Sequence, residues 1–165
     1  MLLSFAAETA ATIPLRVIET AGLDAALAEL PDPGQVWAKA QGFTAALGQV
    51  LTIPGADGTI AQVLVGYGTP AQRARGRFYM GAIAAKLPAG DYKISGGLSG
   101  TELEEASLGW LLSQYKFDRY ADSTATVAQL VAPDGIDADK LAIIANGEAL
   151  TRDLINTPAS DMGPQ

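Results

Sequence analysis

Apolar residues in the first half of the chain form short runs separated by turn-forming residues. The spacing within these runs predicts three strands, over residues 13–19, 49–53 and 60–67, and a short helix over residues 22–30. Residues 31–34 (Pro-Asp-Pro-Gly) close the helix, and the Gly and Pro content of residues 54–58 predicts a hairpin turn. Residues 36–43 fit more than one pattern, and we favour a strand.

In the second half, helical and strand patterns alternate. Helices are predicted from Thr69 to about Lys86, from Thr101 to about Lys116 and from Asp137 to Asn156, and strands over residues 91–95 and 124–132. Each helix has a start signal: Thr69 is an N-cap before Pro70, Thr101 and Glu104 form a capping box, and Asp137 is an N-cap. Alternation at these lengths implies right-handed crossovers, so we expect an α/β fold with a mixed, largely parallel sheet flanked by helices.

The last predicted helix has apolar residues on two sides. One stripe consists of Leu141, Ile144, Ala145 and Ile155, and a nearly opposite stripe consists of Ile143, Leu150 and Leu154. A sheet can cover only one stripe, so the other must meet a neighbouring helix of this domain, a second subunit or a further domain.

Composition and charge exclude several classes of function. The chain has 165 residues, enough for one domain with a real core, and 48% of them are hydrophobic. A net charge of −7 without a dense basic run argues against nucleic acid, and no apolar run approaches the length of a membrane span. The absence of Cys and His removes thiol catalysis, Cys/His zinc sites and imidazole bases. Residues 1–7 are apolar but lack a basic start, which predicts a first strand and not a signal peptide.

The glycine-rich turn at residues 96–100 precedes a helix and is the best candidate for an anion site. Its pattern is neither a dinucleotide fingerprint nor a P-loop, and Glu102, Glu104 and Glu105 would repel a phosphate. We therefore favour a structural turn.

Other polar residues do not form a recognisable active site. Glu102 and Glu105 share a helical face but have no third convergent metal ligand, and Asp137 and Asp139 suit a helix start. The serines considered as nucleophiles have no base partner: Ser95, Ser99 and Ser113. The aromatic residues are interpreted as core and not as a stacking platform: Trp110, Tyr115, Phe117 and Tyr120.

Two segments carry more specific motifs. Residues 108–120 (LGWLLSQYKFDRY) contain a YxFDRY sequence, and residues 152–164 (RDLINTPASDMGP) contain an RDLxNTP sequence followed by a proline. These segments and the spacing between them resemble the leucyl aminopeptidase (cytosol aminopeptidase) family. In that family the second segment joins the N-terminal domain to the catalytic domain.

The resemblance implies a macro-domain-like fold, with residues 1–156 as a non-catalytic N-terminal domain and residues 157–165 as the start of a linker to an absent catalytic domain. The family's two divalent metals, Mn²⁺ or Zn²⁺, are held in that catalytic domain and activate water for attack on the first peptide bond. None of the ligand motifs occurs here, so no catalytic, cofactor-binding or metal-binding residue is assigned to this chain.

The expected parent is therefore a cytoplasmic aminopeptidase that acts on peptides as a homo-hexamer. This chain, inactive alone, would support assembly and access to the active site, with its own catalytic domain as partner and neither nucleic acid nor membrane. The alternative is a free-standing macro-like module that binds a nucleotide or ADP-ribose at residues 96–100.

Overall fold

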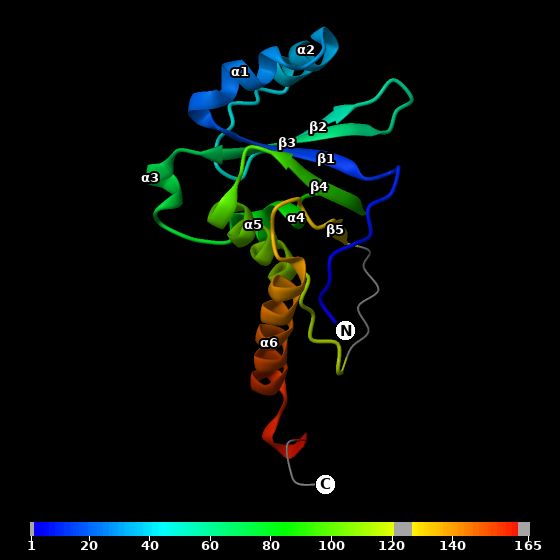
Figure 1. Cartoon of the computed structure of the whole chain (residues 1–165), viewed down its shortest axis with the longest axis vertical. Coiled ribbons are helices and arrows are strands. Elements are labelled where there is room, and N and C mark those ends of the chain that lie inside the picture. The colour runs from blue at the N-terminus through cyan, green and yellow to red at the C-terminus, as the bar shows by residue number, and fades with distance from the viewer. Residues whose placement is uncertain (1, 121–126, 162–165) are drawn as a thin grey trace.

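A five-stranded sheet lies between two layers of helices in the computed structural model, which describes residues 2–120 and 127–161 (Figure 1). The strands run in the order β2-β3-β1-β4-β5, and only β2 is antiparallel to its neighbour. Their bounds are β1 Ile13–Glu19, β2 Val50–Pro54, β3 Ile60–Gly68, β4 Gly90–Gly96 and β5 Ala128–Leu130. The predicted mixed, largely parallel sheet is confirmed, and its likeness to macro domains stays a prediction.

Helices cover both faces of this sheet. Figure 1 shows α1 and α2 on one side, α4 and α5 on the other, and α6 extending away from the body beyond α5. The helices are α1 Leu23–Ala28, α2 Asp32–Ala40, α3 Pro70–Arg73, α4 Tyr79–Ala84, α5 Gly100–Ser113 and α6 Ala138–Asn156, with 3-10 turns η1 Thr20–Gly22 and η2 Ala159–Asp161.

Alternation along the central strands separates two cores. Leu15 and Val17 of β1 face the core under α4 and α5, whereas Ile18 faces the core under α1 and α2. In the same way β3 contributes Val63 and Val65 to the first core and Leu64 to the second. Both faces of the sheet are therefore buried under helices, as is typical of a largely parallel sheet.

A third, smaller core joins α5 to α6. Its buried members are Leu3, Leu111, Ala145 and Ala149. The Asn146 side chain accepts from the Leu3 amide at 2.9 Å and donates to the Leu3 carbonyl at 2.8 Å. The predicted first strand is therefore wrong: a side chain satisfies the Leu3 backbone, and only Ala6 makes an isolated bridge, to Val131.

Residues 36–43, predicted as a strand, instead lie mainly in α2. The helix begins after Pro31 with Asp32 and Pro33 in its first turn, and it buries Gly34 and Ala38 at a helical spacing of four residues. The Pro-Asp-Pro-Gly segment is thus a helix start and not only a turn.

The single helix predicted from Thr69 to Lys86 is divided into α3 and α4. Thr69 and Gln72 form a capping box at the start of α3, so the predicted N-cap is confirmed. Phe78 has a left-handed backbone, with φ of 59°, immediately before α4. This residue fits against α5 because Gly109 has no side chain; a Cβ there would lie 2.9 Å from the Phe78 Cβ.

The other two predicted start signals have different outcomes. Asp137 caps α6 by accepting from the Lys140 amide at 3.0 Å, which confirms the prediction. The Thr101–Glu104 capping box is wrong, because α5 begins at Gly100 with Ser99 as N-cap and no side-chain cap bond. The predicted strand 124–132 is shorter among the described residues, and positions 124–126 lie outside them.

Candidate functional site

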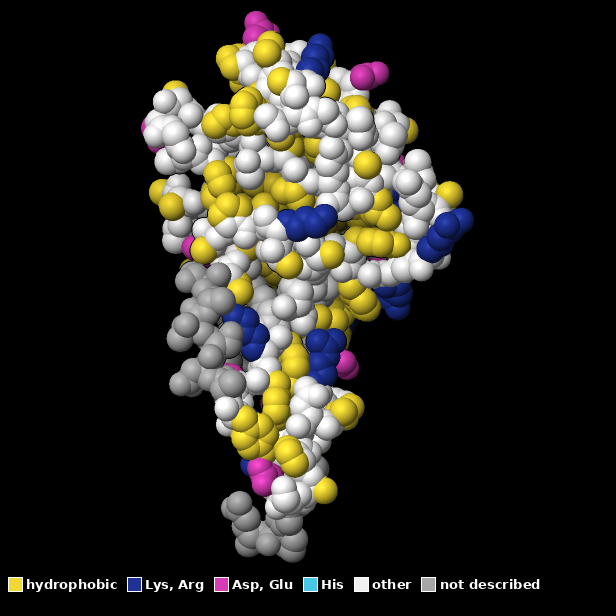
Figure 2. Space-filling model, turned by 180° about the vertical axis from the view of Figure 1, so that it is seen from behind, with side chains coloured by type: hydrophobic (Ala, Val, Ile, Leu, Met, Phe, Trp, Pro, Cys, Tyr) yellow, Lys and Arg dark blue, Asp and Glu magenta, His cyan; other side chains and the backbone are white. Residues whose placement is uncertain are grey.

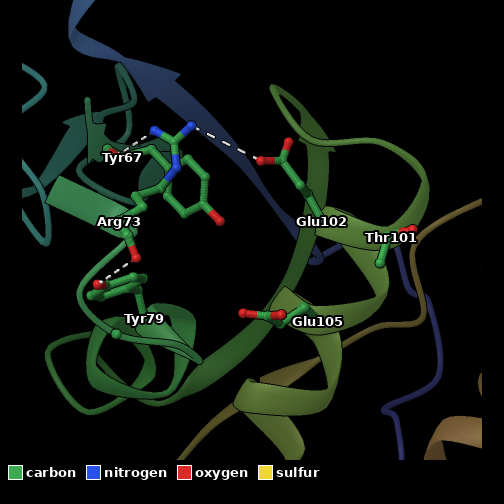
Figure 3. A pocket seen from close by; sticks show the side chains of 7 residues that line it. Tyr67, Arg73, Tyr79, Thr101, Glu102 and Glu105 are labelled. Carbon is green, nitrogen blue, oxygen red and sulfur yellow. Dashed lines mark hydrogen bonds and ion pairs between the residues drawn. The ribbon is translucent and has the colours of Figure 1, made fainter. Parts of the chain in front are cut away.

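A shallow pocket of about 160 Å³ lies at the carboxyl ends of the parallel strands β1 and β3. This is the edge at which open α/β sheets usually bind ligands. Side chains from β3, α3, α4 and the start of α5 surround the pocket (Figure 3). The pocket is lined by Tyr67, Arg73, Gly76, Tyr79, Thr101, Glu102 and Glu105.

Arg73 occupies one wall of this pocket and is largely withdrawn from solvent, with 13% of its side chain exposed. The Thr69–Gln72 capping box fixes the short helix that carries it. The guanidinium lies 4.2 Å from the centre of the Tyr67 ring and donates to the Tyr67 carbonyl at 3.0 Å. It also pairs with Glu19 and lies 3.9 Å from Glu102, so its charge is already neutralised.

The remaining charges of the pocket favour a net negative potential. Arg77 binds Glu105 at 2.8 Å, and this hydrogen bond lowers the pKa of the Glu105 carboxyl. Burial, followed by the nearby Glu102 charge, raises the pKa of the Tyr67 hydroxyl, which points into the pocket (Figure 3). Glu19, Glu102 and Glu105 outnumber the two arginines. The pocket is thus unsuited to the phosphates of the nucleotide or ADP-ribose alternative.

The glycine-rich turn beside the pocket is held by packing. Gly97 has φ of 90°, and a Cβ at this position would lie 1.7 Å from the Val17 carbonyl oxygen of β1. Lys93, in the adjoining cleft, is bound by Glu8 at 2.8 Å and Asp134 at 3.3 Å. These contacts favour the structural interpretation of residues 96–100.

Most of the other candidate groups are engaged in structure, whereas Ser99 is the N-cap of α5 without a side-chain cap bond. The Ser95 hydroxyl donates to the Leu15 carbonyl at 3.3 Å, and the Ser113 hydroxyl donates to the Trp110 carbonyl at 2.6 Å. Glu102 and Glu105 face Arg73 and Arg77. Within residues 2–120 and 127–161, no group of three acidic side chains could hold a metal ion.

The predicted aromatic core is confirmed for Trp110, which is fully buried and donates from its indole to the Ala128 carbonyl at 3.1 Å. Tyr115 is half-buried against the α5–α6 core. Tyr120 is not a core residue: it is 55% exposed and lies edge-on to Phe117. It follows α5, in a segment without helix or strand, so helical periodicity does not place it.

Hydrogen bonds connect the described residues of the two motif segments. The Tyr115 hydroxyl donates to Asp153 at 2.8 Å and accepts from Asn156 at 3.2 Å. Arg119 donates to the Thr157 hydroxyl at 3.2 Å, and Thr157 in turn donates to the Asp153 carbonyl at 2.7 Å. Residues 115–120 therefore fix the end of α6 and the chain that follows it. In the sequence, the signal for this contact was the presence of polar residues in both motifs.

A second candidate site is the outer side of α6. Ile143, Leu150 and Leu154 are 73%, 60% and 52% exposed, respectively, and no described residue covers them. Hydrophobic side chains also gather over the projecting lower part of the molecule in Figure 2. In the other predicted stripe Leu141 and Ala145 are buried, but Ile144 and Ile155 are exposed. Fewer residues of this stripe are buried than predicted. The contact of α6 with α5 is made by the small residues Ala145 and Ala149, which let the two helices lie close together.

Removing the Arg73 charge is expected to destabilise the domain more than removing the charge of Arg77. Arg73→Met would leave Glu19 and Glu102 facing an apolar side chain and is expected to cost about 1–3 kcal/mol. Arg77→Met is the matched control, since Arg77 also combines a carboxylate with an aromatic ring but is 69% exposed. Urea unfolding at pH 7 measures both variants. Equal losses would contradict the interpretation of Arg73 as the structural cation.

None of the described helices is long and apolar enough to cross a membrane.

Comparison with known proteins identifies the fold. A family model described as "M17 aminopeptidase, N-terminal domain" matches residues 13–133. The crystal structure of the cytosol aminopeptidase from Coxiella burnetii is similar, with a TM-score of 0.83 and 28% identity over 96% of this chain and 34% of that one. No curated protein matches the chain.

Two further structures agree. The bottromycin maturation enzyme BotP, solved in complex with Mn, matches with a TM-score of 0.65 and 25% identity over 94% of this chain and 34% of that one. A mutant of tomato leucine aminopeptidase has a TM-score of 0.63 over 99% of this chain and 40% of that one, and at 17% identity it supports the fold alone. The chain thus spans about a third of the length of the first two structures. The chain belongs to the M17 aminopeptidase family and matches the N-terminal domain of that family.

Proposed function

We propose that this chain is the non-catalytic N-terminal domain of a metal-dependent aminopeptidase that removes N-terminal residues from peptides. The observation that carries the proposal is the combination of the family match over residues 13–133 with an apolar side of α6 that the described domain leaves open. An exposed stripe of large aliphatic side chains is typical of a surface that meets another domain.

The division of labour has chemical support within the chain. The carboxylates at the pocket are paired with arginines, and the sequence has neither His nor Cys to act as a base or nucleophile. We assign the metals, Mn²⁺ or Zn²⁺, to the catalytic domain of the parent. One similar enzyme, BotP, was solved with Mn, which supports a metal-dependent parent.

We further propose that the parent is a cytoplasmic homo-hexamer and that this domain supports its assembly and the access of peptides to the active site. The name of the Coxiella burnetii relative, a cytosol aminopeptidase, supports the compartment. Light scattering of the protein expressed from the complete reading frame measures the subunit number, and any other number would overturn the hexamer.

The isolated chain is expected to show no hydrolysis of leucine p-nitroanilide above buffer, with or without added Mn²⁺, because it supplies no metal-activated water. The control is the protein expressed from the complete reading frame, which should turn over the same substrate. Clear turnover by the isolated chain would overturn the non-catalytic assignment. A complete protein with no activity would overturn the aminopeptidase assignment.

A further inference from the structure

Gly147 lies in the middle of the exposed side of α6. Ile143, Gly147, Leu150 and Leu154 follow one another at intervals of four, three and four residues, which places them along one side of a helix. The buried residues Leu141, Ala145 and Ala149 occupy the opposite side. The outer stripe therefore has large aliphatic side chains with a notch between them at the glycine.

Nothing in the described domain requires a glycine at this position. A Cβ at Gly147 would meet no described atom within 4 Å, and its φ is not left-handed. A glycine in the interior of a helix is less stable than alanine, because it loses more backbone freedom on folding. No contact within the described domain offsets the stability that the helix loses by having glycine at position 147.

Two other glycines inside described helices, Gly81 and Gly109, lie where a neighbouring segment comes close. A Cβ at Gly81 of α4 would lie 2.8 Å from the Gly109 carbonyl oxygen of α5. A Cβ at Gly109 would lie 2.9 Å from the Phe78 Cβ. In both cases the missing side chain lets a neighbouring segment approach the helix closely. Gly147 differs from these two, because no described atom lies within 4 Å of the position that its Cβ would take.

We propose that a helix of the catalytic domain crosses α6 over Gly147 and places an apolar side chain in the notch between Ile143 and Leu150. This inference rests on the proposed function and names the contact by which the two domains dock. A crossing helix fits because the stripe spans three helical turns and its knobs flank a single hole.

Two observations favour the catalytic domain as the partner that covers the stripe: the length of the similar structures and the position of the stripe. The Coxiella burnetii enzyme and BotP are each about three times as long as this chain, so each has a large further region. The linker that the resemblance predicts begins at Thr157, which is buried and hydrogen-bonded to the last turn of the helix. A domain tethered there is confined near the stripe, which gives it a high effective concentration.

Hydrogen exchange of the α6 amides 143–154 tests the contact in the protein expressed from the complete reading frame. These amides are expected to exchange at least about tenfold more slowly there than in the isolated chain, because docking adds to the stability of the helix. Gly147→Leu fills the notch and is expected to abolish that difference. Ala40→Leu, at an exposed position of α2, adds the same side chain far from the stripe and should leave the difference intact.

Gly147→Ala in the isolated chain is expected to stabilise the domain, in contrast to the loss of docking expected for Gly147→Leu in the complete protein. It is expected to raise the melting temperature by about 2–4 °C, because nothing in the described domain is displaced. Lowered stability would overturn the absence of a local role for the glycine.

The remaining outcomes separate the two proposals. Unprotected α6 amides in a complete protein that hydrolyses leucine p-nitroanilide would overturn the docking contact and leave the function standing. A complete protein without activity would overturn the function itself. If the isolated chain sedimented as a dimer with protected α6 amides, a second copy of the chain would fill the notch. That result would overturn the proposed contact with the catalytic domain.

Discussion

Gly97→Ala is expected to destabilise the domain by roughly 3–5 kcal/mol, from overpacking together with an unfavourable backbone conformation. The new Cβ would lie 1.7 Å from the Val17 carbonyl oxygen, and the backbone φ of 90° is unfavourable for any residue with a Cβ. Relief requires that the turn move away from β1, which would disturb the pairing of β1 with β4. Thermal and urea unfolding of the purified chain measure the loss, which corresponds to a melting temperature lower by roughly 10 °C.

Gly96→Ala is the matched control. Gly96 is the adjacent residue, ends β4 and has no described atom within 4 Å of an added Cβ. Its φ is not left-handed, so the substitution should change the free energy of unfolding by less than about 1 kcal/mol. Similar losses for the two variants would mean that the turn tolerates a Cβ at either position and that the packing interpretation is wrong.

This pair of variants also bears on function. Binding of an anion at residues 96–100 would need backbone approach at both glycines, which is a separate requirement from folding. A loss confined to Gly97 would show that the turn is required for β1 packing.

The sheet could be predicted from the sequence because its strands carry their own signals. Val63, Leu64 and Val65 form a continuous apolar run, as a strand buried on both faces requires. The hairpin between β2 and β3 was equally local, since Pro54, Gly55 and Gly58 suffice to mark it. Such features depend on residues that are close in the sequence.

The breaks in the helices could not be predicted in the same way. The division of α3 from α4 depends on Phe78 and on its close approach to Gly109, which lies 31 residues later in the sequence. The loss of the first strand depends on Asn146, which binds Leu3 across 143 positions. These contacts are set by the packing of distant segments, and hydrophobic periodicity carries no information about them.

The pocket and the docking surface differ in the same respect. The outer stripe of α6 was predictable because Ile143, Leu150 and Leu154 repeat with the helical period. The burial of Arg73 was not, because it results from the positions of Glu19, Tyr67 and Glu102 on three different elements. Only the structure shows that this cation is already neutralised and that the pocket is acidic.

Trp110→Ala is expected to destabilise the domain by about 3–5 kcal/mol, the cost typical of removing a large buried aromatic side chain. Trp110 is fully buried on the sheet side of α5 and packs against Tyr92 with ring centres 6.1 Å apart. Its indole also satisfies the carbonyl of Ala128, the first residue of β5, and alanine would remove that donor. Chemical denaturation followed by circular dichroism measures the change.

Trp37→Ala provides a control with the same chemistry and less burial. Its indole also donates to a backbone carbonyl, that of Thr52 at 3.0 Å, but the residue is 39% exposed at the surface of α2. The loss should therefore be about 2 kcal/mol, in proportion to the smaller apolar area removed from water. If the two variants lost equal stability, burial beneath α5 would not be the source of the Trp110 contribution.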